Sequence, residues 1–368
     1  MERREFRIFI SLFLFLICVS VYPAELPFDK LLKEILPVSS PTGYEHRLAE
    51  KIQKLLPETL STEKDNLGSL YLSLGEGTRK LALMACMDEY GYIVSGVTED
   101  GYLRPDRVVP APHPVYDSFH QGHPMLIRTE EGVVAGVMAI PSVHILSRER
   151  RQQLQSSSLD QAFLDIGVHS ELEVREKGVR MLDPVIPFPD FTPLAGEKMA
   201  GPALGNKTCC TLLLYLAGKV SSEKLSQVTT FVWMAQTKFN RRSRRLTEAM
   251  GATRVKSKLD PERAIIIDIF PVDWSKEADV SIGKGPVLVF NTSKTSGLGQ
   301  RIEGIAKDKG IPLQKYSGFQ SSLMNPFLSE SSDILILALP VKFFATPVEM
   351  VDFKDVRALE GLLRGLLE

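Results

Sequence analysis

The chain has 368 residues, of which 44% are hydrophobic and 24% are charged, and its formal net charge is −1. This composition is that of an ordinary globular protein, and it excludes a disordered chain, a collagen-like fibre and a polytopic membrane protein. The length predicts two domains or one large domain with an insertion, and the balanced charge argues against a nucleic-acid-binding protein.

The first residues are typical of an export signal. Three arginines occur within the first seven residues, and no charged residue follows between Ile8 and Ala24. A basic start before an apolar run that is too short to span a bilayer is the pattern of a secretory signal. We therefore expect residues 1–24 to direct the protein to the periplasm or the cell exterior. The alternative is an uncleaved N-terminal anchor, which would be the chain's only contact with a membrane.

The segment that follows predicts two helices and then three strands. Apolar residues recur at helical spacing in Phe28–Leu36 and Glu45–Leu56, with a turn of Pro, Thr and Gly at residues 41–43 between them. Three apolar runs come next and predict strands. These are Leu67–Leu74, Lys80–Met87 and Gly91–Val97.

The pattern changes between Gly101 and Asp190. Short apolar runs are interrupted there by Gly and Pro, which predicts a small β-rich domain. The clear helical pattern within this stretch is confined to Glu171–Lys177. The stretch interrupts a chain of helices and strands, so we interpret it as an insertion.

After Gly201 helices and strands alternate again. Helical periodicity marks Thr208–Leu216, Leu298–Lys309 and Val351–Leu367. The expected strands are Val228–Ala235, Ala264–Ile269, Val287–Phe290 and Ile334–Leu339. Alternating strands and helices predict an α/β fold with a mostly parallel central sheet that is covered by helices on both faces.

Several segments, taken in chain order, resemble those of one enzyme family. They read DNLGSLYLSLGEG, ALMACMDEYGYIVSGVTEDGYLR, FLDIGVHSELEVREKGVRMLDPVI, GPALGNKTCCTLLL and ATPVEMVDFKDV. Each is similar to a segment of the M42 peptidases, the dinuclear metallo-aminopeptidases that include glutamyl aminopeptidases and build tetrahedral, dodecameric particles. The resemblance covers almost the whole chain after the signal-like segment. It implies a metallo-aminopeptidase (phosphorylase-like) α/β domain with a twisted sheet, made of residues 25–92 and 192–368, and an inserted β-rich oligomerisation domain, residues 93–191.

The resemblance also implies where the family's metal ligands would stand. In this chain those positions are Cys86 for a His, Gly205 for the bridging Asp, Lys238 for a Glu, Asp268 for an Asp and Ala345 for a His. The general base, a Glu in the family, aligns with Thr237. Three more residues adjoin the site: Asp88, which in the family orients the first ligand, Asn206 and Gln236.

These substitutions remove most of what the chemistry needs. A two-metal hydrolase requires several carboxylates and histidines around its cations, and a base for the attacking water. Lys238 would instead place a positive charge where a cation belongs, and Thr237 has no useful basicity. No His follows His169, so no shift of the alignment supplies the C-terminal ligand. We therefore expect no cofactor and no hydrolysis. The remaining role is that of a pseudo-peptidase that binds peptides or partners, or that assembles as a homo-oligomer through the insertion.

The second hypothesis is an active aminopeptidase with a rebuilt, mononuclear site. Cys86, Asp88 and Asp268 would then hold one divalent cation such as Zn, Co or Mn. If no metal binds, we expect Lys238 to form an ion pair with Asp268, because a lone buried carboxylate is costly. A disulfide between Cys86 and Cys209 is a further, weaker alternative.

Two other groups of residues are less informative. His113, His120 and His123 crowd the insertion, and loop or interface histidines explain them better than a metal site does. Ser317–Ser322 stands where the family has a Gly-Gly-Thr-Asp turn, without the Asp.

Overall fold

The computed structural model describes most of the chain after the signal-like segment. It covers residues 27–153, 159–220, 225, 227–243, 246–272, 279–290, 297–317, 321–328 and 333–368. The expected signal, residues 1–24, lies outside this part. Among the helices of these ranges, none combines the length and the apolar character that crossing a bilayer requires.

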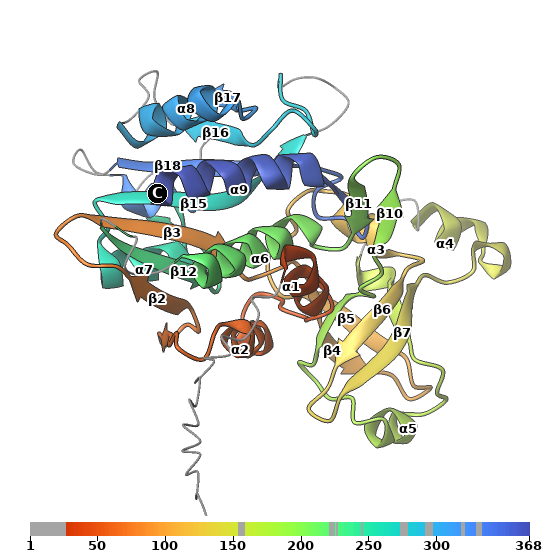
Figure 1. The fold of residues 1–368 in the computed structure, drawn as a ribbon. Coiled ribbons are helices and arrows are strands. Elements are labelled where there is room, and N and C mark those ends of the chain that lie inside the picture. Colours follow the sequence, from red (N-terminus) through yellow and green to blue (C-terminus); the bar gives the residue numbers. More distant parts are fainter. Residues whose placement is uncertain are drawn as a thin grey trace, which may run out of the picture.

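An 11-stranded mixed sheet forms the larger part of the molecule (Figure 1). Its main path is β1 (Glu63–Lys64), β2 (Leu70–Leu74), β12 (Val228–Met234), β3 (Lys80–Cys86), β15 (Arg263–Val272), β18 (Asp333–Lys342), β19 (Glu349–Asp352), β11 (Lys198–Gly201) and β10 (Thr192–Leu194). Strand β16 (Val287–Phe290) pairs with β18, and β17 (Gln314–Ser317) pairs with β16. The central strands β12, β3, β15 and β18 run parallel, whereas the pairs toward both edges of the main path are antiparallel. The α/β class is confirmed, with the parallel pairing concentrated at the centre.

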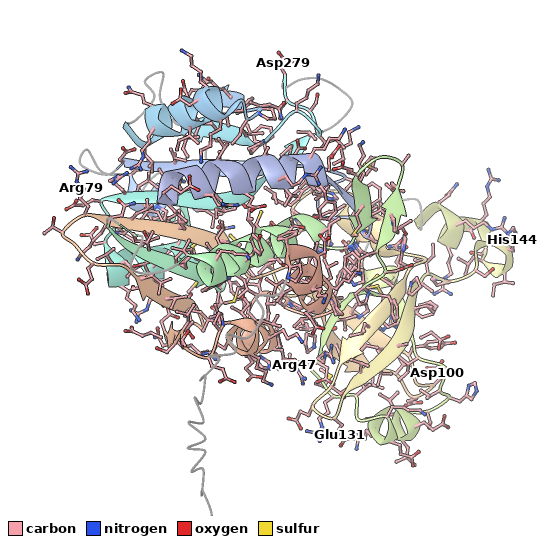
Figure 2. The ribbon with its side chains drawn as sticks, viewed as in Figure 1. Arg47, Arg79, Asp100, Glu131, His144 and Asp279 are labelled. Atoms are coloured by element: carbon pink, nitrogen blue, oxygen red, sulfur yellow. The ribbon has the colours of Figure 1, made fainter. Side chains whose placement is uncertain are left out.

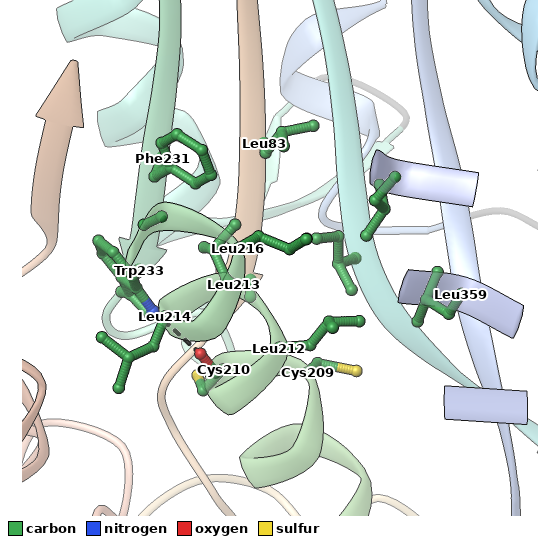
Figure 3. Packing of buried hydrophobic residues seen from close by; sticks show 14 of the residues in the cluster. Leu83, Cys209, Cys210, Leu212, Leu213, Leu214, Leu216, Phe231, Trp233 and Leu359 are labelled. Carbon is green, nitrogen blue, oxygen red and sulfur yellow. Dashed lines mark hydrogen bonds between the residues drawn. The ribbon is translucent and has the colours of Figure 1, made fainter. Parts of the chain in front are cut away.

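Helices cover both faces of this sheet. They are α1 (Phe28–Ile35), α2 (His46–Leu55), α6 (Leu204–Lys219), α7 (Met250–Leu259), α8 (Gly297–Lys309) and α9 (Phe353–Leu367). Side chains alternate along β3, so that Leu83 belongs to the core on the face that holds α1, α6 and α9, while Met84 belongs to the core on the other face, with α7. Helix α6 is apolar on nearly all sides and is therefore buried. Trp233 packs on it and donates its indole N–H to the Cys210 carbonyl at 3.2 Å (Figure 3).

The β-rich insertion folds as a closed barrel beside the sheet (Figure 1). Its strands, in barrel order, are β4 (Tyr92–Val97), β5 (Leu103–Arg107), β8 (Phe163–Asp165), β7 (Val133–Ala139), β6 (Pro124–Arg128) and β9 (Pro184–Pro187). The prediction of a single helix here was wrong. Besides α5 (Glu171–Glu176), the stretch holds α3 (Tyr116–His120) and α4 (Arg148–Gln153). Helix α3 has five residues, and α4 (RERRQQ) consists of polar residues, so neither shows an apolar helical repeat in the sequence.

Some elements depart from the sequence prediction. The closing helix α9 begins at Phe353, because Asp352 caps it by accepting from the Lys354 N–H at 3.0 Å, and the residues before the cap pair as β19. Helix α7 and the hairpin of β13 (Asn240–Ser243) and β14 (Leu246–Ala249) were not predicted. Short 3₁₀ turns occur at Val143–Ile145, Leu159–Gln161 and Asn325–Phe327.

Candidate functional site

The predicted site positions meet at one edge of the central sheet, where parallel strands end. Cys86 is the last residue of β3, Lys238 follows β12, and Asp268 lies in β15. Gly205 lies in the first turn of α6, and Ala345 follows β18. The carboxyl ends of parallel strands are the usual place for a site in α/β folds. The structure thus brings together all five positions that the resemblance implied.

Asp88 is the centre of the polar network at this edge. Its side chain is 0% exposed. It accepts hydrogen bonds from the Thr42 hydroxyl at 3.0 Å and from the Lys238 N–H at 2.8 Å, and also from the Thr237 hydroxyl. The Thr237 hydroxyl therefore donates its single hydrogen to Asp88. Its side chain holds a neighbouring acid in place and cannot serve as a general base.

Lys238 carries the positive charge of the site. Its Nζ lies 3.5 Å from Asp88 Oδ1 and donates to the Asp88 carbonyl at 2.6 Å. The ammonium also lies 5.3 Å from the centre of the Tyr90 ring. Burial by itself would lower the pKa of this ammonium and is the largest single effect, but the neighbouring Asp88, Cys86, Tyr90 and Asp268, with Asp88 foremost, together hold the pKa above its usual value.

The prediction that Lys238 forms an ion pair with Asp268 was wrong. Among the described residues, Lys238 pairs with Asp88 instead. The reason is the lateral order of the strands: β12, which leads into Lys238, lies directly beside β3, and β15 lies on the far side of β3. The side chain of Lys238 therefore lies beside the turn after β3, which contains Asp88.

Asp268 and Cys86 remain as the residual metal candidates. Asp268 is half-buried, and burial raises its pKa to about 6. Cys86 is buried, and burial raises the pKa of its thiol well above the ordinary value, so it stays protonated. A metal would need the thiolate. Cys86, Cys209 and Cys210 are all free, so the alternative of a disulfide to Cys209 is not found.

One carboxylate, that of Glu349, binds the backbone at both the position of the bridging Asp and the position of the last His. Glu349 is buried, and it accepts from the Gly205 N–H at 3.1 Å and from the Ala345 N–H at 2.9 Å. Burial raises the pKa of Glu349 to about 7. A β-carbon at Gly205 would lie 2.7 Å from Ile269 Cγ2 and 2.9 Å from Val341 Cγ2. The scaffold therefore has no room for the side chain of a bridging Asp.

A cavity of about 220 Å³ opens at this edge of the sheet. It is lined by Cys86, Tyr90, Asn206, Thr237, Lys238, Asn240, Asp268, Ile269, Pro271, Ser321, Ser322, Leu323 and Phe344. A smaller cavity of about 30 Å³ adjoins it toward the barrel, and Lys238 and Tyr90 line both. The predicted turn 317–322 contributes Ser321 and Ser322, while its residues 318–320 lie outside the described part.

The backbone around the site is strained. Ala203, Gln236, Phe343 and Ala345 have φ of 51°, 54°, 55° and 55°. Such angles cost non-glycine residues energy that the surrounding structure must offset, and they concentrate at functional sites. The backbone therefore keeps conformations that are typical of a functional site, although the metal-ligand side chains of the family are replaced here.

The sequence analysis did not identify two aromatic residues that line the cavity, Tyr90 and Phe344, or the burial of His120. Tyr90 and Phe344 form an edge-to-face pair with ring centres 6.1 Å apart, and nothing in their spacing marked them. His120 was expected in a loop or interface, but it is buried in the barrel and its Nδ1–H donates to the Tyr116 carbonyl at 2.8 Å. Burial lowers the pKa of His120 to about 4.

The family model of the M42 glutamyl aminopeptidases matches residues 68–362. This chain belongs to that family. The lysyl aminopeptidase of Pyrococcus furiosus is 27% identical over 350 residues, which are 92% of this chain and 96% of the relative. The putative aminopeptidase FrvX of Escherichia coli is 24% identical over 351 residues, 92% and 94% of the two chains.

Solved M42-like structures agree with the fold. The Pyrococcus horikoshii TET1 peptidase, which can assemble into a tetrahedron or a large octahedral shell, matches with a TM-score of 0.79 and 26% identity, over 93% of this chain and 99% of that one. A TET aminopeptidase from a marine sediment thaumarchaeon matches with a TM-score of 0.80 at 22% identity, over 92% and 96%. The similarity extends through both the sheet domain and the barrel.

M42 enzymes are generally dependent on divalent metals, and the residues present here do not fit a metal pair. The described ranges contain no group of three or more His, Cys, Asp or Glu side chains that could hold a metal ion. Glu349 directs its oxygens to backbone N–H groups, and Asp88 is occupied by hydroxyls and by Lys238. The ammonium of Lys238 would repel any cation placed beside Asp268.

Proposed function

We propose that this M42-family protein is a pseudo-peptidase, which binds ligands in the cavity at the sheet edge and does not hydrolyse them. The observation that carries the proposal is the ammonium of Lys238, bound to Asp88 among the family's metal-ligand positions. An internal ammonium can neutralise a buried carboxylate, as a metal would. It cannot act as a Lewis acid that lowers the pKa of a bound water.

Two further features support the loss of hydrolysis. The base position is held by Thr237, whose hydroxyl donates to Asp88. The bridging position is held by Gly205, where even a β-carbon would be crowded. A return to activity would therefore require several simultaneous changes, including movement of the side chains packed against Gly205.

A binding role is supported by the cavity and by the backbone around it. The cavity remains open although the groups for hydrolysis are absent from its walls. Four non-glycine residues near it keep left-handed backbone angles, which are costly and are typical of sites whose shape matters. The alternative, an active aminopeptidase with one metal on Cys86, Asp88 and Asp268, requires a thiolate that burial disfavours.

The purified mature protein is expected to carry well under one Zn, Co or Mn per chain and to leave aminoacyl-anilides intact. Elemental analysis and an anilide assay with added metals test both statements, with the Pyrococcus furiosus lysyl aminopeptidase as the positive control. A content near two metals per chain, or turnover that a chelator abolishes, would refute the proposal that the protein is a pseudo-peptidase.

The proposal includes a homo-oligomer that assembles through the barrel domain, residues 93–191. Solved relatives of the TET type assemble into closed particles. Strand β7 exposes apolar side chains on one face, with Val133 52% and Val137 45% exposed, and apolar side chains that gather on one exposed face are a feature of interaction sites. We expect at least a dimer by light scattering at micromolar concentration, and a monomeric mass would contradict this.

The proposal also includes export, directed by residues 1–24. The support is the basic start and the apolar run in the sequence. N-terminal sequencing of the protein recovered from cells distinguishes a cleaved signal from an anchor, since an anchored chain would begin at residue 1.

A further inference from the structure

Two arginines lie close together where the barrel meets the sheet domain. Arg47 lies in the first turn of α2, between that helix and the barrel (Figure 2), and its Nη2 donates to the Thr129 carbonyl at 3.1 Å. Arg128 precedes Thr129 and is the last residue of β6. Met125 and Ile127 of the same strand lie in the barrel core, so side-chain alternation places Arg128 on the outer face of the barrel. Arg47 and Arg128 therefore stand on the two sides of one domain junction.

This pair of positive charges has no counter-charge in the described part of the chain. The ion pairs that arginines make there involve other arginines, and neither Arg47 nor Arg128 has a carboxylate partner. Burial and the positive charge of Arg47 both lower the pKa of Arg128. Both side chains are half-buried, and water and salt screen half-buried charges less than exposed ones. The two guanidinium groups therefore repel each other.

Arg128 also holds a donor that no described residue accepts. Its Nε is buried and has no hydrogen-bond partner there, whereas buried donors in native proteins almost always have one. Each guanidinium offers five N–H donors in a planar fork, and Arg47 gives one Nη2 bond to Thr129. The repulsion and the unmatched donor are independent observations at one place. A single negatively charged acceptor would remove both costs.

We propose that Arg47 and Arg128 form an anion-binding site at the junction of the barrel and the sheet domain, and that its ligand is a phosphate or sulfate group. Guanidinium forks match the oxygens of such groups through paired N–H···O bonds. A dianion would balance both positive charges, whereas one carboxylate would balance a single charge. The cavity at the sheet edge is lined by other residues, so this inference is independent of the proposed function.

The test is calorimetric titration of the full mature protein with sodium phosphate, in a slightly alkaline chloride buffer of constant ionic strength. We expect one saturable site per chain. Arg128→Met keeps most of the apolar stem and removes the charge and the donors, and it should weaken binding about tenfold or more. Arg79→Met, an exposed change on the far side of the sheet domain (Figure 2), should leave the affinity unchanged. No saturable binding, or an unchanged affinity in Arg128→Met, would overturn the site.

Thermal unfolding distinguishes a lost site from a disturbed fold. In phosphate-free buffer Arg128→Met removes a repulsion, so it should melt at the same temperature as the wild type or higher. In dilute phosphate, at about five times the dissociation constant, the wild type should gain about 1–2 °C, because the ligand binds the folded state, and the variant should gain nothing. A variant that melts lower in phosphate-free buffer, or that gains as much as the wild type, would contradict the site.

Two further titrations distinguish a free ion from a phosphate group on a larger molecule. Phosphate that binds more tightly than methyl phosphate assigns the site to the free ion, and equal affinities assign it to a phosphomonoester. Dimethyl phosphate carries one charge and should bind more weakly than either, and equal binding of all three would refute the match to a dianion. These ligands contain no peptide bond, so peptide turnover would refute the proposed function and leave this measurement unaffected.

Discussion

Lys238→Met is expected to lower the free energy of unfolding by about 3–5 kcal/mol, the usual cost of orphaning a buried charge. Asp88, which is 0% exposed, would keep its bonds to Thr42 and Thr237 but lose its counter-charge. Urea unfolding at neutral pH measures the change. Lys309→Met is the matched control, because Lys309 pairs with Glu368 on the surface and an exposed pair contributes about 1 kcal/mol at most.

The double variant Lys238→Met with Asp88→Asn separates the lost charge from lost packing. Removing both charges leaves no buried ion, so the double variant should lose less stability than the two single changes added together. Recovery is partial, because an Asn amide cannot accept from both the Thr237 hydroxyl and the Lys238 N–H as the carboxylate does. A Lys238→Met protein as stable as the wild type would show that the ammonium does not stabilise the site.

The sequence predicted the central strands because they are long apolar runs. Lys80–Met87 and Val228–Ala235 correspond to β3 and β12, which are buried along most of their length. Helix α7 escaped prediction because its buried face consists of Gly251, Ala252 and Val255, which are too small to give a marked apolar periodicity.

The composition of the site was predictable from the sequence, whereas its pairing was not. The ligand positions follow from local motifs, and the structure gathers them at one sheet edge. The partner of Lys238 depends on which strand lies beside β12, and this lateral order results from long-range packing. The bond that Glu349 accepts from Gly205 joins residues 144 positions apart, so no local pattern indicates it.

Gly205→Asp, which restores the family's bridging residue, is expected to destabilise the protein by at least about 3 kcal/mol. The β-carbon alone would lie 2.7 Å and 2.9 Å from the methyl groups of Ile269 and Val341, and overpacking a core costs about 1–3 kcal/mol. The carboxylate would add a second buried acid beside Glu349, whose Oε2 would lie 3.6 Å from that β-carbon, and like charges repel strongly when buried.

Gly205→Ala separates the steric part of this cost from the charge. It should lie between the wild type and Gly205→Asp in unfolding free energy. Gly304→Ala is the matched control, because Gly304 lies within helix α8 and its added β-carbon would meet nothing within 4 Å. That change should stabilise the protein by about 0.5–1 kcal/mol through helix propensity. If Gly205→Asp folds as well as the wild type and gains metal, the site has kept room for the bridging ligand, and a dinuclear centre could be rebuilt without repacking Ile269 and Val341.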